Sequence, residues 1–358
     1  MHIATRQGSR IILDLAFVDD AQASGGKSRS VQLLEIFISN GFSTERIDRP
    51  ARPGKWSLLW KAIQGILKFG IYPPLCADSL RTTGVNYHTC RELVRRYPDV
   101  NVYVLEGTGF GQMQVVSILR HYNKEMILVP ANLESLSPYE SWTHRIDVHT
   151  RFGAELKHYR RANSIFCISP EETWLLRVMS CTAFFLPYRP PDSLMTRILK
   201  RRDQHSLRRG EGLFYFANFR NAPNVLGLKN FLEEHKHKGK TIRIAGLGIE
   251  NVTPLLKGHS EFQILGELSD EQLEHEIISA KGIILNHFPT AGMLTRVPEL
   301  LMSGIALEAN FDALKSYSLV PPVPESGTHL GALSAQAEAF FISRVISLLQ
   351  PQKTQPDT

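Results

Sequence analysis

Cysteine is scarce in this sequence, and the few cysteines do not form a recognisable site. The 358 residues include 4 cysteines, and none of them has the Cys–Cys or Cys–His spacing of a metal site. This excludes the usual kinds of structural zinc site and favours a reducing compartment. The four are Cys76, Cys90, Cys167 and Cys181.

Targeting and membrane-spanning segments are missing as well. The N-terminal residues MHIATRQGSR lack the apolar core of a signal peptide, and no apolar run is long enough to cross a membrane. We therefore expect a cytoplasmic protein, either free or associated with a membrane surface from that side.

An excess of basic residues is absent from the second half of the chain. Residues 1–190 hold 23 Lys and Arg against 17 Asp and Glu, whereas residues 191–358 hold 18 of each kind, so the first half carries the whole net charge of +6. A basic half could face anionic lipid, nucleic acid or a charged acceptor, although solvated surface charge is the commoner explanation.

The length and the alternation of elements predict two α/β domains. A chain of 358 residues is long for one core, and its apolar fraction of 43% is normal for a globular protein. Short apolar runs alternate with helical stretches, which favours mostly parallel, doubly wound sheets. Strands are predicted at 10–17, 84–88, 100–106, 126–129, 165–168 and 184–186, and, after a proline-rich link at 187–191, at 213–217, 241–245, 262–265, 282–286 and 305–308.

The helices are predicted from apolar spacing and from capping residues. Ser169-Pro170 and Ser269 are typical helix starts, because serine caps the first backbone N–H groups and proline suits the first turn. No helix or strand is predicted for a basic stretch at 197–209 or for a loop at 321–326. Helices are predicted at 27–40, from 169 onward, and at 224–234, 269–279, 293–303 and 333–349.

Residues 55–71 form the most amphipathic segment of the chain. The polar and small residues Ser57, Lys61, Gln64, Gly65 and Lys68 lie on one narrow helical face, and Trp56, Leu59, Trp60, Ile63 and Leu67 lie on the other. A wide apolar face usually belongs to a core helix. The mixture of tryptophan and lysine leaves a peripheral membrane contact as the alternative.

Two glycine-containing turns are candidates for contact with a ligand. Gly25-Gly26 lies between a predicted strand and a predicted helix, where glycine allows close approach of the backbone. Its sequence GGKS lacks the first glycine of a phosphate loop, since Ala21 stands in that position. The second turn precedes the helix predicted at 293–303, and Gly292 would place backbone N–H groups and a positive dipole end beside a phosphate.

The residues around Gly292 add side chains suited to a nucleotide. Thr295 and Arg296 supply a hydroxyl and a cation, and Glu299 lies three residues after Arg296 on the same face of the helix. Glu299 could accept hydrogen bonds from sugar hydroxyls once a diphosphate is bound. An ordinary surface Arg–Glu pair on a crossover helix is the simpler alternative.

Further polar candidates follow the other predicted strands, at the edge where two doubly wound domains place their ligands. Two arginines and a helix dipole facing a glycine-lined gap would suit a diphosphate leaving group. No metal site and no tightly bound cofactor are expected. The second-domain candidates are Asn218, Arg220, Gly246, Gly248 and the backbone at Leu268; those of the first domain are Asp19, Asp20, Gly25, Gly26, Glu106, Gly107, Asn132 and Glu134.

Taken in order, these segments resemble the GT-B glycosyltransferases, in particular the retaining, nucleotide-sugar-dependent group classed as family 4-like. The resemblance covers nearly the whole chain, and its last block is the most specific. The blocks are GGKSRSVQLLEIFISNGF (25–42), ANLES (131–135), ELKHYRRANSIFCISPEE (155–172), FLPY (185–188), FYFANFRNAPNVLGLKNFL (214–232), IRIAGLG (242–248), ILGEL (264–268) and AGMLTRVPELLMSGIAL (291–307).

The resemblance implies a fold and a role for each site residue. It implies a Rossmann-like acceptor domain (1–188), a Rossmann-like donor domain (189–335), a helix that crosses back to the first domain (336–350) and a disordered tail (351–358). Glu299 matches the glutamate that holds the donor ribose. Gly292, Thr295, Arg296 and Arg220 match the segments at the donor phosphates, Leu268 the contact with the base, and Gly25-Gly26 the loop that closes on the donor.

Three positions depart from the pattern of this family. Ala291 stands where a second glutamate is common, eight residues before Glu299, and Ala131 stands where histidine is common. The usual lysine a few residues after Arg220 is also missing, with Asn224 near its place. Retaining transfer depends on stabilisation of the departing diphosphate, so Arg220 and Arg296 could still suffice.

Three functions stay open on the sequence. The first is transfer of a sugar from a nucleotide diphosphate sugar to a glycan, lipid-linked or small-molecule acceptor, with retention, in which Arg220, Arg296 and Glu299 carry the chemistry. The second is a catalytically inactive relative that serves in assembly or regulation, suggested by Ala131 and Ala291. The third is a protein that binds nucleic acid or a lipid surface. Of these two partners, the lipid surface stays open and no nucleic acid is expected.

Overall fold

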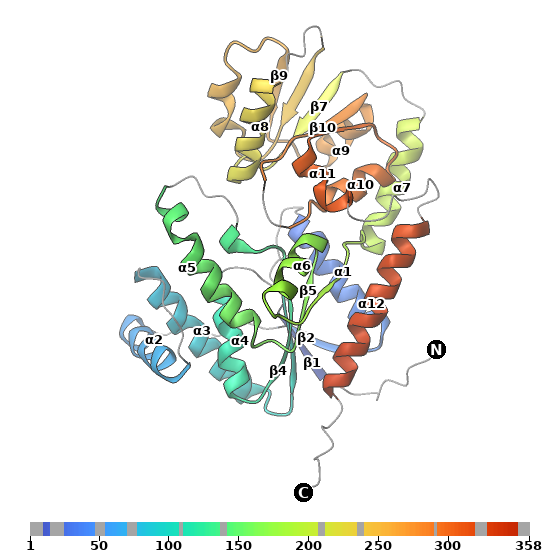
Figure 1. The fold of residues 1–358 in the computed structure, drawn as a ribbon. Coiled ribbons are helices and arrows are strands. Elements are labelled where there is room, and N and C mark those ends of the chain that lie inside the picture. Colours follow the sequence, from blue (N-terminus) through green and yellow to red (C-terminus); the bar gives the residue numbers. More distant parts are fainter. Residues whose placement is uncertain are drawn as a thin grey trace, which may run out of the picture.

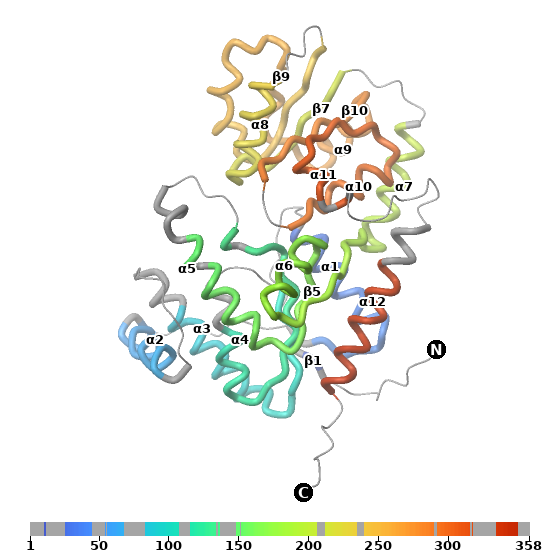
Figure 2. Tube along the Cα trace, in the orientation of Figure 1, coloured from blue at the N-terminus to red at the C-terminus, as the bar shows by residue number. Residues whose placement is uncertain are grey.

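The computed structural model contains two parallel β-sheets, one above the other in Figures 1 and 2. It describes residues 10–14, 25–46, 54–69, 77–106, 110–136, 142–206, 212–234, 240–289, 292–318 and 328–349. The first sheet has six strands in the order β2-β1-β3-β4-β5-β6, and the second has five in the order β11-β10-β7-β8-β9. All pairings recorded within these sheets are parallel. The predicted α/β class with two Rossmann-like domains is confirmed.

The strands are short and carry mostly apolar side chains, as expected for parallel sheets covered on both faces. Those of the first sheet are β1 (Arg10–Asp14), β2 (Ser43–Arg46), β3 (Val102–Glu106), β4 (Glu125–Val129), β5 (Ser164–Cys167) and β6 (Ala183–Phe185). Those of the second sheet are β7 (Leu213–Phe216), β8 (Ile242–Ala245), β9 (Phe262–Gly266), β10 (Gly282–Leu285) and β11 (Leu307–Ala309).

The helices connect these strands and cover the sheets. In the first domain they are α1 (Gly25–Ser39), α2 (Lys55–Phe69), α3 (Ala77–Arg96), α4 (Phe110–His121), η1 (Glu134–Leu136), α5 (Trp142–Tyr159) and α6 (Pro170–Val178). The later helices are α7 (Asp192–Ser206), α8 (Ala222–Glu234), η2 (Ile249–Asn251), η3 (Thr253–Leu256), α9 (Asp270–Ser279), α10 (Arg296–Met302), α11 (Phe311–Ser318) and α12 (Thr328–Leu349).

Capping residues fix two of these helices where the sequence predicts. The Ser169 hydroxyl accepts a hydrogen bond from the Glu172 N–H, and Pro170 is the first residue of α6. At α9, Ser269 and Gln272 form a reciprocal capping box, in which each side chain bonds the backbone N–H of the other residue. Both helices therefore start at positions set by local sequence.

The last helix belongs to the core of the first domain, although it follows the second domain in the chain. Phe341 is fully buried, and its ring centroid lies 5.4 Å from that of Phe37 in α1 and 4.6 Å from that of Phe166 in β5. Ile342 and Val345 join the same apolar cluster. Figure 1 shows α12 beside α1, along the side of the first domain.

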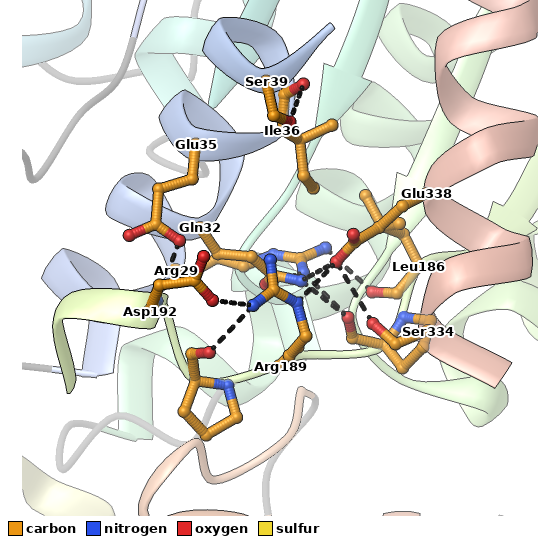
Figure 3. Close-up of polar contacts among 12 residues, drawn as sticks. Arg29, Gln32, Glu35, Ile36, Ser39, Leu186, Arg189, Asp192, Ser334 and Glu338 are labelled. Atoms are coloured by element: carbon orange, nitrogen blue, oxygen red, sulfur yellow. Dashed lines mark hydrogen bonds and ion pairs between the residues drawn. The ribbon is translucent and has the colours of Figure 1, made fainter. Parts of the chain in front are cut away.

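A buried polar network holds the link between the domains against α1 and α12 (Figure 3). Arg29 of α1 donates to the backbone oxygens of Leu186 at 2.8 Å and Pro187 at 3.2 Å. Arg189 of the link donates through Nε to Glu338 of α12 at 3.2 Å and through Nη1 to Asp192 at 2.8 Å. The network ties together three segments that are far apart in the sequence, namely α1, the interdomain link and α12.

The strand predicted at 84–88 is wrong, because these residues lie inside α3. Thr83, Gly84, Tyr87 and Cys90 are buried, at the spacing of one helical face. A Cβ on Gly84 would lie 2.3 Å from the backbone oxygen of Leu58 in α2. Val85 and Tyr87 favoured a strand locally, whereas the close crossing of two helices is a tertiary requirement that local propensity does not report.

The predicted start of α10 is also wrong. The helix begins at Arg296, not at Met293, so Gly292 lies in the preceding loop with a φ of +87°. Pro298 gives the physical reason, because proline has no N–H for an intrahelical hydrogen bond and fits only the first turn of a helix. The helix N-terminus that was predicted at Gly292 therefore lies at Thr295 and Arg296 instead.

Several elements were missing from the sequence prediction. β2, α7 and α11 occupy segments that had received no element. The loop predicted at 321–326 and the tail predicted at 351–358 lie outside the described residues. Among the described residues, no helix is long and apolar enough to cross a membrane.

Candidate functional site in the interdomain cleft

The central contact across the cleft joins Glu299 of α10 to Tyr188 of the interdomain link. The Tyr188 hydroxyl donates to Glu299 Oε1 at 2.7 Å and also interacts with the side chain of Ser28 in α1. Ser28 lies two residues after Gly26, so the glycine turn and Glu299 are brought to the same place. Burial raises the pKa of the Glu299 carboxyl, while the hydrogen bond from Tyr188 opposes this shift.

Arg296 points into the second domain. Its Nη1 donates to the backbone oxygen of Phe216 at 2.9 Å, and its guanidinium lies 5.5 Å from the centre of the Phe216 ring. Burial lowers the pKa of Arg296. The side chain therefore fixes α10 against the carboxyl end of β7 and adds a positive charge beneath the cleft. Thr295, just before it, is buried and makes no side-chain capping bond.

Arg220 and Asn218 lie in the exposed loop after β7. The Asn218 side-chain oxygen accepts from the Arg220 N–H at 3.0 Å, which shapes the loop, and both residues are exposed. The Arg220 side chain packs over Gly248, where a Cβ would come within 2.7 Å of Arg220 Cγ. Arg220 is therefore the better placed of the two predicted arginines to meet a mobile anion.

Packing and backbone conformation explain why the predicted site positions Gly246 and Gly248 are glycines. A Cβ on Gly246 would lie 1.8 Å from the Ala217 backbone oxygen, and Gly246 has a φ of +152°. Gly248 has a φ of +75°, in the left-handed region that glycine tolerates best. The Leu268 side chain packs against the apolar cluster below β7 and β8. These positions shape the edge of the second sheet.

On the first-domain side, Glu106 at the end of β3 accepts a short hydrogen bond from Ser30 of α1. The contact is buried, so Glu106 anchors the first turns of α1 below Gly25-Gly26, which are themselves the first two residues of that helix. Asp20, also predicted for this side, lies outside the described residues, as do Asp19 and Gly107.

Asn132 meets the second domain directly. A Cβ on Gly292 would lie 3.0 Å from Asn132 Cβ and 3.1 Å from the Ala131 backbone oxygen. Asn132 Oδ1 is buried and has no hydrogen-bond partner among the described residues. Glu134 opens the short helix η1 two residues later. The structure thus brings the 131–135 and 292–299 segments, predicted separately, to one place.

A cavity of about 300 Å³ lies between the two domains at this point. Glu172 is buried in its wall, where Oε1 accepts from the Leu133 N–H at 2.7 Å and Oε2 has no partner among the described residues. Burial raises the pKa of Glu172 to about 8. The cavity is lined by Leu133, Leu136, Ser169, Glu171, Glu172, Leu175, Pro289, Gly292 and Lys315.

Three residues of this cleft were not predicted as site residues. Tyr188 stands in the FLPY block, but its contact with Glu299 spans 111 positions of sequence. Glu172 ends the 155–172 block but has no predicted site role, and Lys315 belongs to α11, which was not predicted. No group of His, Cys, Asp and Glu in the described part of the chain could hold a metal ion.

Comparison with known proteins gives the fold. No protein-family model matches the sequence, and none of the curated proteins does. Among solved structures, sucrose-phosphate synthase (tll1590) from Thermosynechococcus elongatus is similar with a TM-score of 0.63 and 14% identity, over 96% of this chain and 92% of that one.

Two further solved structures are similar over nearly their whole length. An α,α-trehalose-phosphate synthase (UDP-forming) from Burkholderia xenovorans, in complex with glucose-6-phosphate, has a TM-score of 0.57 and 8% identity, over 96% of this chain and 100% of that one. The catalytic domain of starch synthase IV from Arabidopsis thaliana, bound to ADP and acarbose, has a TM-score of 0.52 and 9% identity, over 96% of each. This chain therefore has the two-domain GT-B fold that these glycosyltransferases share.

Proposed function

We propose that this protein is a glycosyltransferase that moves a sugar from a nucleotide diphosphate sugar to an acceptor bound between its two domains. The observation that carries the proposal is the contact of Glu299 with Tyr188 and, through it, with the first turn of α1. This contact joins the second domain, the link and the glycine turn at one point of a GT-B cleft. Among the proteins of similar fold, the starch synthase is bound to ADP and the trehalose-phosphate synthase is named as UDP-forming.

The second domain would hold the donor. The Glu299 carboxylate has oxygens suited to accept from two ribose hydroxyls, and its hydrogen bond from Tyr188 fixes its orientation. Gly292 and Thr295 would line the phosphates, and the backbone at Leu268 would meet the base. Asn218, Gly246 and Gly248 would shape the loops beside them.

Two arginines would stabilise the departing diphosphate. Arg220 is exposed and can move onto a phosphate, whereas Arg296 is held by the Phe216 carbonyl and would act through its charge. Positive charge that is fixed before the reaction lowers the barrier for a leaving anion. Transfer with retention needs this stabilisation more than it needs a strong base, which is compatible with alanine at position 291.

The cavity would hold the acceptor. Its volume of about 300 Å³ is at the lower end of small-molecule sites and suits a sugar-sized group. Glu172 and Lys315 offer a hydrogen-bonding acid and a cation on its wall. Asp20, Glu106, Asn132 and Glu134 remain candidates for the acceptor side. The acceptor would be the end of a glycan, a lipid-linked sugar or a small molecule.

A thermal-shift titration with UDP, GDP and ADP tests the donor site. We expect one of them to raise the Tm, and Glu299→Ala and Arg220→Ala to weaken its binding by about 10–100-fold, the usual effect of losing a hydrogen bond to a charged group. Glu233→Ala in α8 and Arg202→Ala in α7 are exposed controls that should bind like the parent protein. Absence of binding by all three nucleotides would sink the proposal.

A catalytically inactive GT-B protein is the competing function, suggested by Ala131 and Ala291. It predicts nucleotide binding without turnover. Slow hydrolysis of the matching nucleotide sugar decides between the two, because an active site transfers to water when no acceptor is present. Hydrolysis that disappears in Arg220→Ala and persists in Arg202→Ala supports the enzyme, and its absence with intact binding supports the inactive relative.

A further inference from the structure

Helix α2 turns its apolar face outward. The exposed fractions are 84% for Trp56, 62% for Trp60, 80% for Leu67, 41% for Leu59 and 38% for Ile63. These positions are spaced as one face of a helix, so they form a continuous apolar strip, which we call the α2 strip. Single exposed apolar residues are ordinary on protein surfaces, but a strip with two tryptophans indicates an interaction site.

The orientation of α2 is fixed by its opposite face. Leu58, Ala62 and Gly65 are buried, and the backbone of α2 at Leu58 comes so close to α3 that only glycine fits at position 84. Lys61 Nζ lies 2.8 Å from Nδ1 of His88 in α3, on the flank of the contact. The interpretation of α2 as a core helix is therefore wrong for its wide apolar face, because α2 is packed by the face that carries Leu58, Ala62 and Gly65.

The hairpin that carries the α2 strip is strongly basic. Residues 54–96 contain seven basic residues and two acidic ones, a net charge of +5 in a chain whose total is +6. Arg91, Arg95 and Arg96 are exposed on α3. The rest of the chain is nearly neutral, so the positive charge of this protein is concentrated beside its most exposed apolar strip.

The α2 strip lies away from the cleft. Figures 1 and 2 place α2 on the outer side of the first domain, beyond α3, whereas α10, α6 and the start of α1 meet between the domains. A large partner could therefore cover α2 and leave the candidate site open to its ligands.

We propose that α2 is a docking surface for an anionic lipid bilayer. The helix would lie in the plane of the membrane surface, with the α2 strip among the lipid tails and the basic residues of the hairpin at the headgroups. Tryptophan suits the boundary between water and lipid, and each basic residue near an anionic surface adds to the attraction. The charge complementarity favours this occupant over a second copy of the chain, whose own hairpin would bring a second charge of +5. The inference does not rest on the proposed transfer reaction.

Co-sedimentation with vesicles tests this docking surface. The probes are vesicles of phosphatidylcholine alone and of phosphatidylcholine mixed with phosphatidylglycerol. We expect the protein to sediment with the mixed vesicles, to shift its tryptophan fluorescence to the blue, and to bind less as salt rises. In the variant Trp56→Ser/Trp60→Ser, binding should fall about tenfold or more and the shift should disappear.

Trp174→Ser provides the matched control, because Trp174 is 66% exposed on α6 and lies outside the α2 strip. This variant should bind vesicles like the parent protein. The proposal is overturned if the protein does not sediment with the mixed vesicles, or if it binds both kinds of vesicle equally at all salt concentrations. It is overturned as well if the double variant binds the mixed vesicles as well as Trp174→Ser does. It is also overturned if light scattering shows a dimer that only the double variant loses, since a second copy would then cover the strip.

Discussion

Glu172 holds the loop of residues 131–135 in place from the first turn of α6. Its Oε1 accepts from the Leu133 N–H, so the loop that meets Gly292 across the cleft depends on one buried acid. A carboxyl in such a place is ionised only at a cost, since burial favours its neutral form. Tyr188 and Glu299 show the same arrangement at the other end of the cleft, where one phenol orients one carboxyl.

Glu172 should make the stability of the protein depend on pH. The carboxyl ionises near 4.5 in the unfolded chain and, because of burial, near 8 in the folded protein. Between these values the folded state binds more protons than the unfolded state, so the free energy of unfolding falls as the pH rises through this window. The slope expected from this one group is roughly 1 kcal/mol per pH unit.

The variant Glu172→Gln isolates this effect, because the amide oxygen can still accept from the Leu133 N–H. The free energy of unfolding, measured in urea, should favour the variant over the parent protein more strongly at pH 8 than at pH 5. The variant Glu233→Gln, on the exposed surface of α8, should keep the parent slope. Identical slopes in Glu172→Gln and the parent protein would contradict the assignment.

At the scale of elements, the hairpin of α2 and α3 depends on a close crossing of two helices. Glycine at position 84 lets the backbones touch, and this contact buries the face of α2 that carries Leu58, Ala62 and Gly65 and leaves the α2 strip exposed. The same crossing explains why residues 84–88 are helical although they resemble a strand. One glycine therefore determines both the local structure and the surface that the hairpin presents.

Gly84→Ala should separate α2 from α3. The added Cβ would stand 2.3 Å from the Leu58 backbone oxygen, so backbone and not only side chains must move. We expect a loss of about 1–3 kcal/mol in the free energy of unfolding, the usual cost of overpacking. Gly153→Ala in α5 is the control, because nothing lies within 4 Å of its Cβ and alanine favours a helix over glycine. Equal stability of the two variants would refute the close crossing.

At the scale of the whole molecule, the two ends of the described chain share one core. α12 follows the second domain but packs on the first, and its Glu338 bonds Arg189 of the link and Gln32 of α1. The link therefore lies between α1 and α12 (Figure 3), and these hydrogen bonds help to fix the position of Tyr188 relative to α1. The geometry of the cleft depends on residues at both ends of the sequence.

Two neighbouring residues, Phe340 and Phe341, allow a test of whether α12 belongs to the core of the first domain. Phe341 is fully buried between Phe37 and Phe166, whereas Phe340 is 42% exposed. Phe341→Ala should cost about 3–5 kcal/mol, as expected for a buried phenylalanine. Phe340→Ala should cost clearly less, since the Phe340 side chain is partly exposed to solvent in the folded protein. Urea unfolding measures both, and similar losses would mean that α12 is not part of the first core.

Much of the fold could be predicted from the sequence. The parallel strands of both sheets other than β2, the caps at Ser169 and Ser269 and the order of the two domains all follow from patterns within short segments. The residues of the cleft were partly predictable, since Asn132 was chosen from one block and Gly292 and Glu299 from another, and all three lie along one cleft. The start of α10 was predicted three residues too early, because the limit that Pro298 places on the helix was missed.

The sequence by itself determined the alternation of strands and helices, the helix caps and the concentration of charge in residues 54–96, because each depends on neighbours along the chain. Only the tertiary structure decided that α2 exposes its tryptophans, that Tyr188 meets Glu299, and that Glu172 is buried beside a cavity. The physical reason is that burial and hydrogen bonding depend on which distant segment packs against a residue. In this chain, those partners lie up to hundreds of positions away.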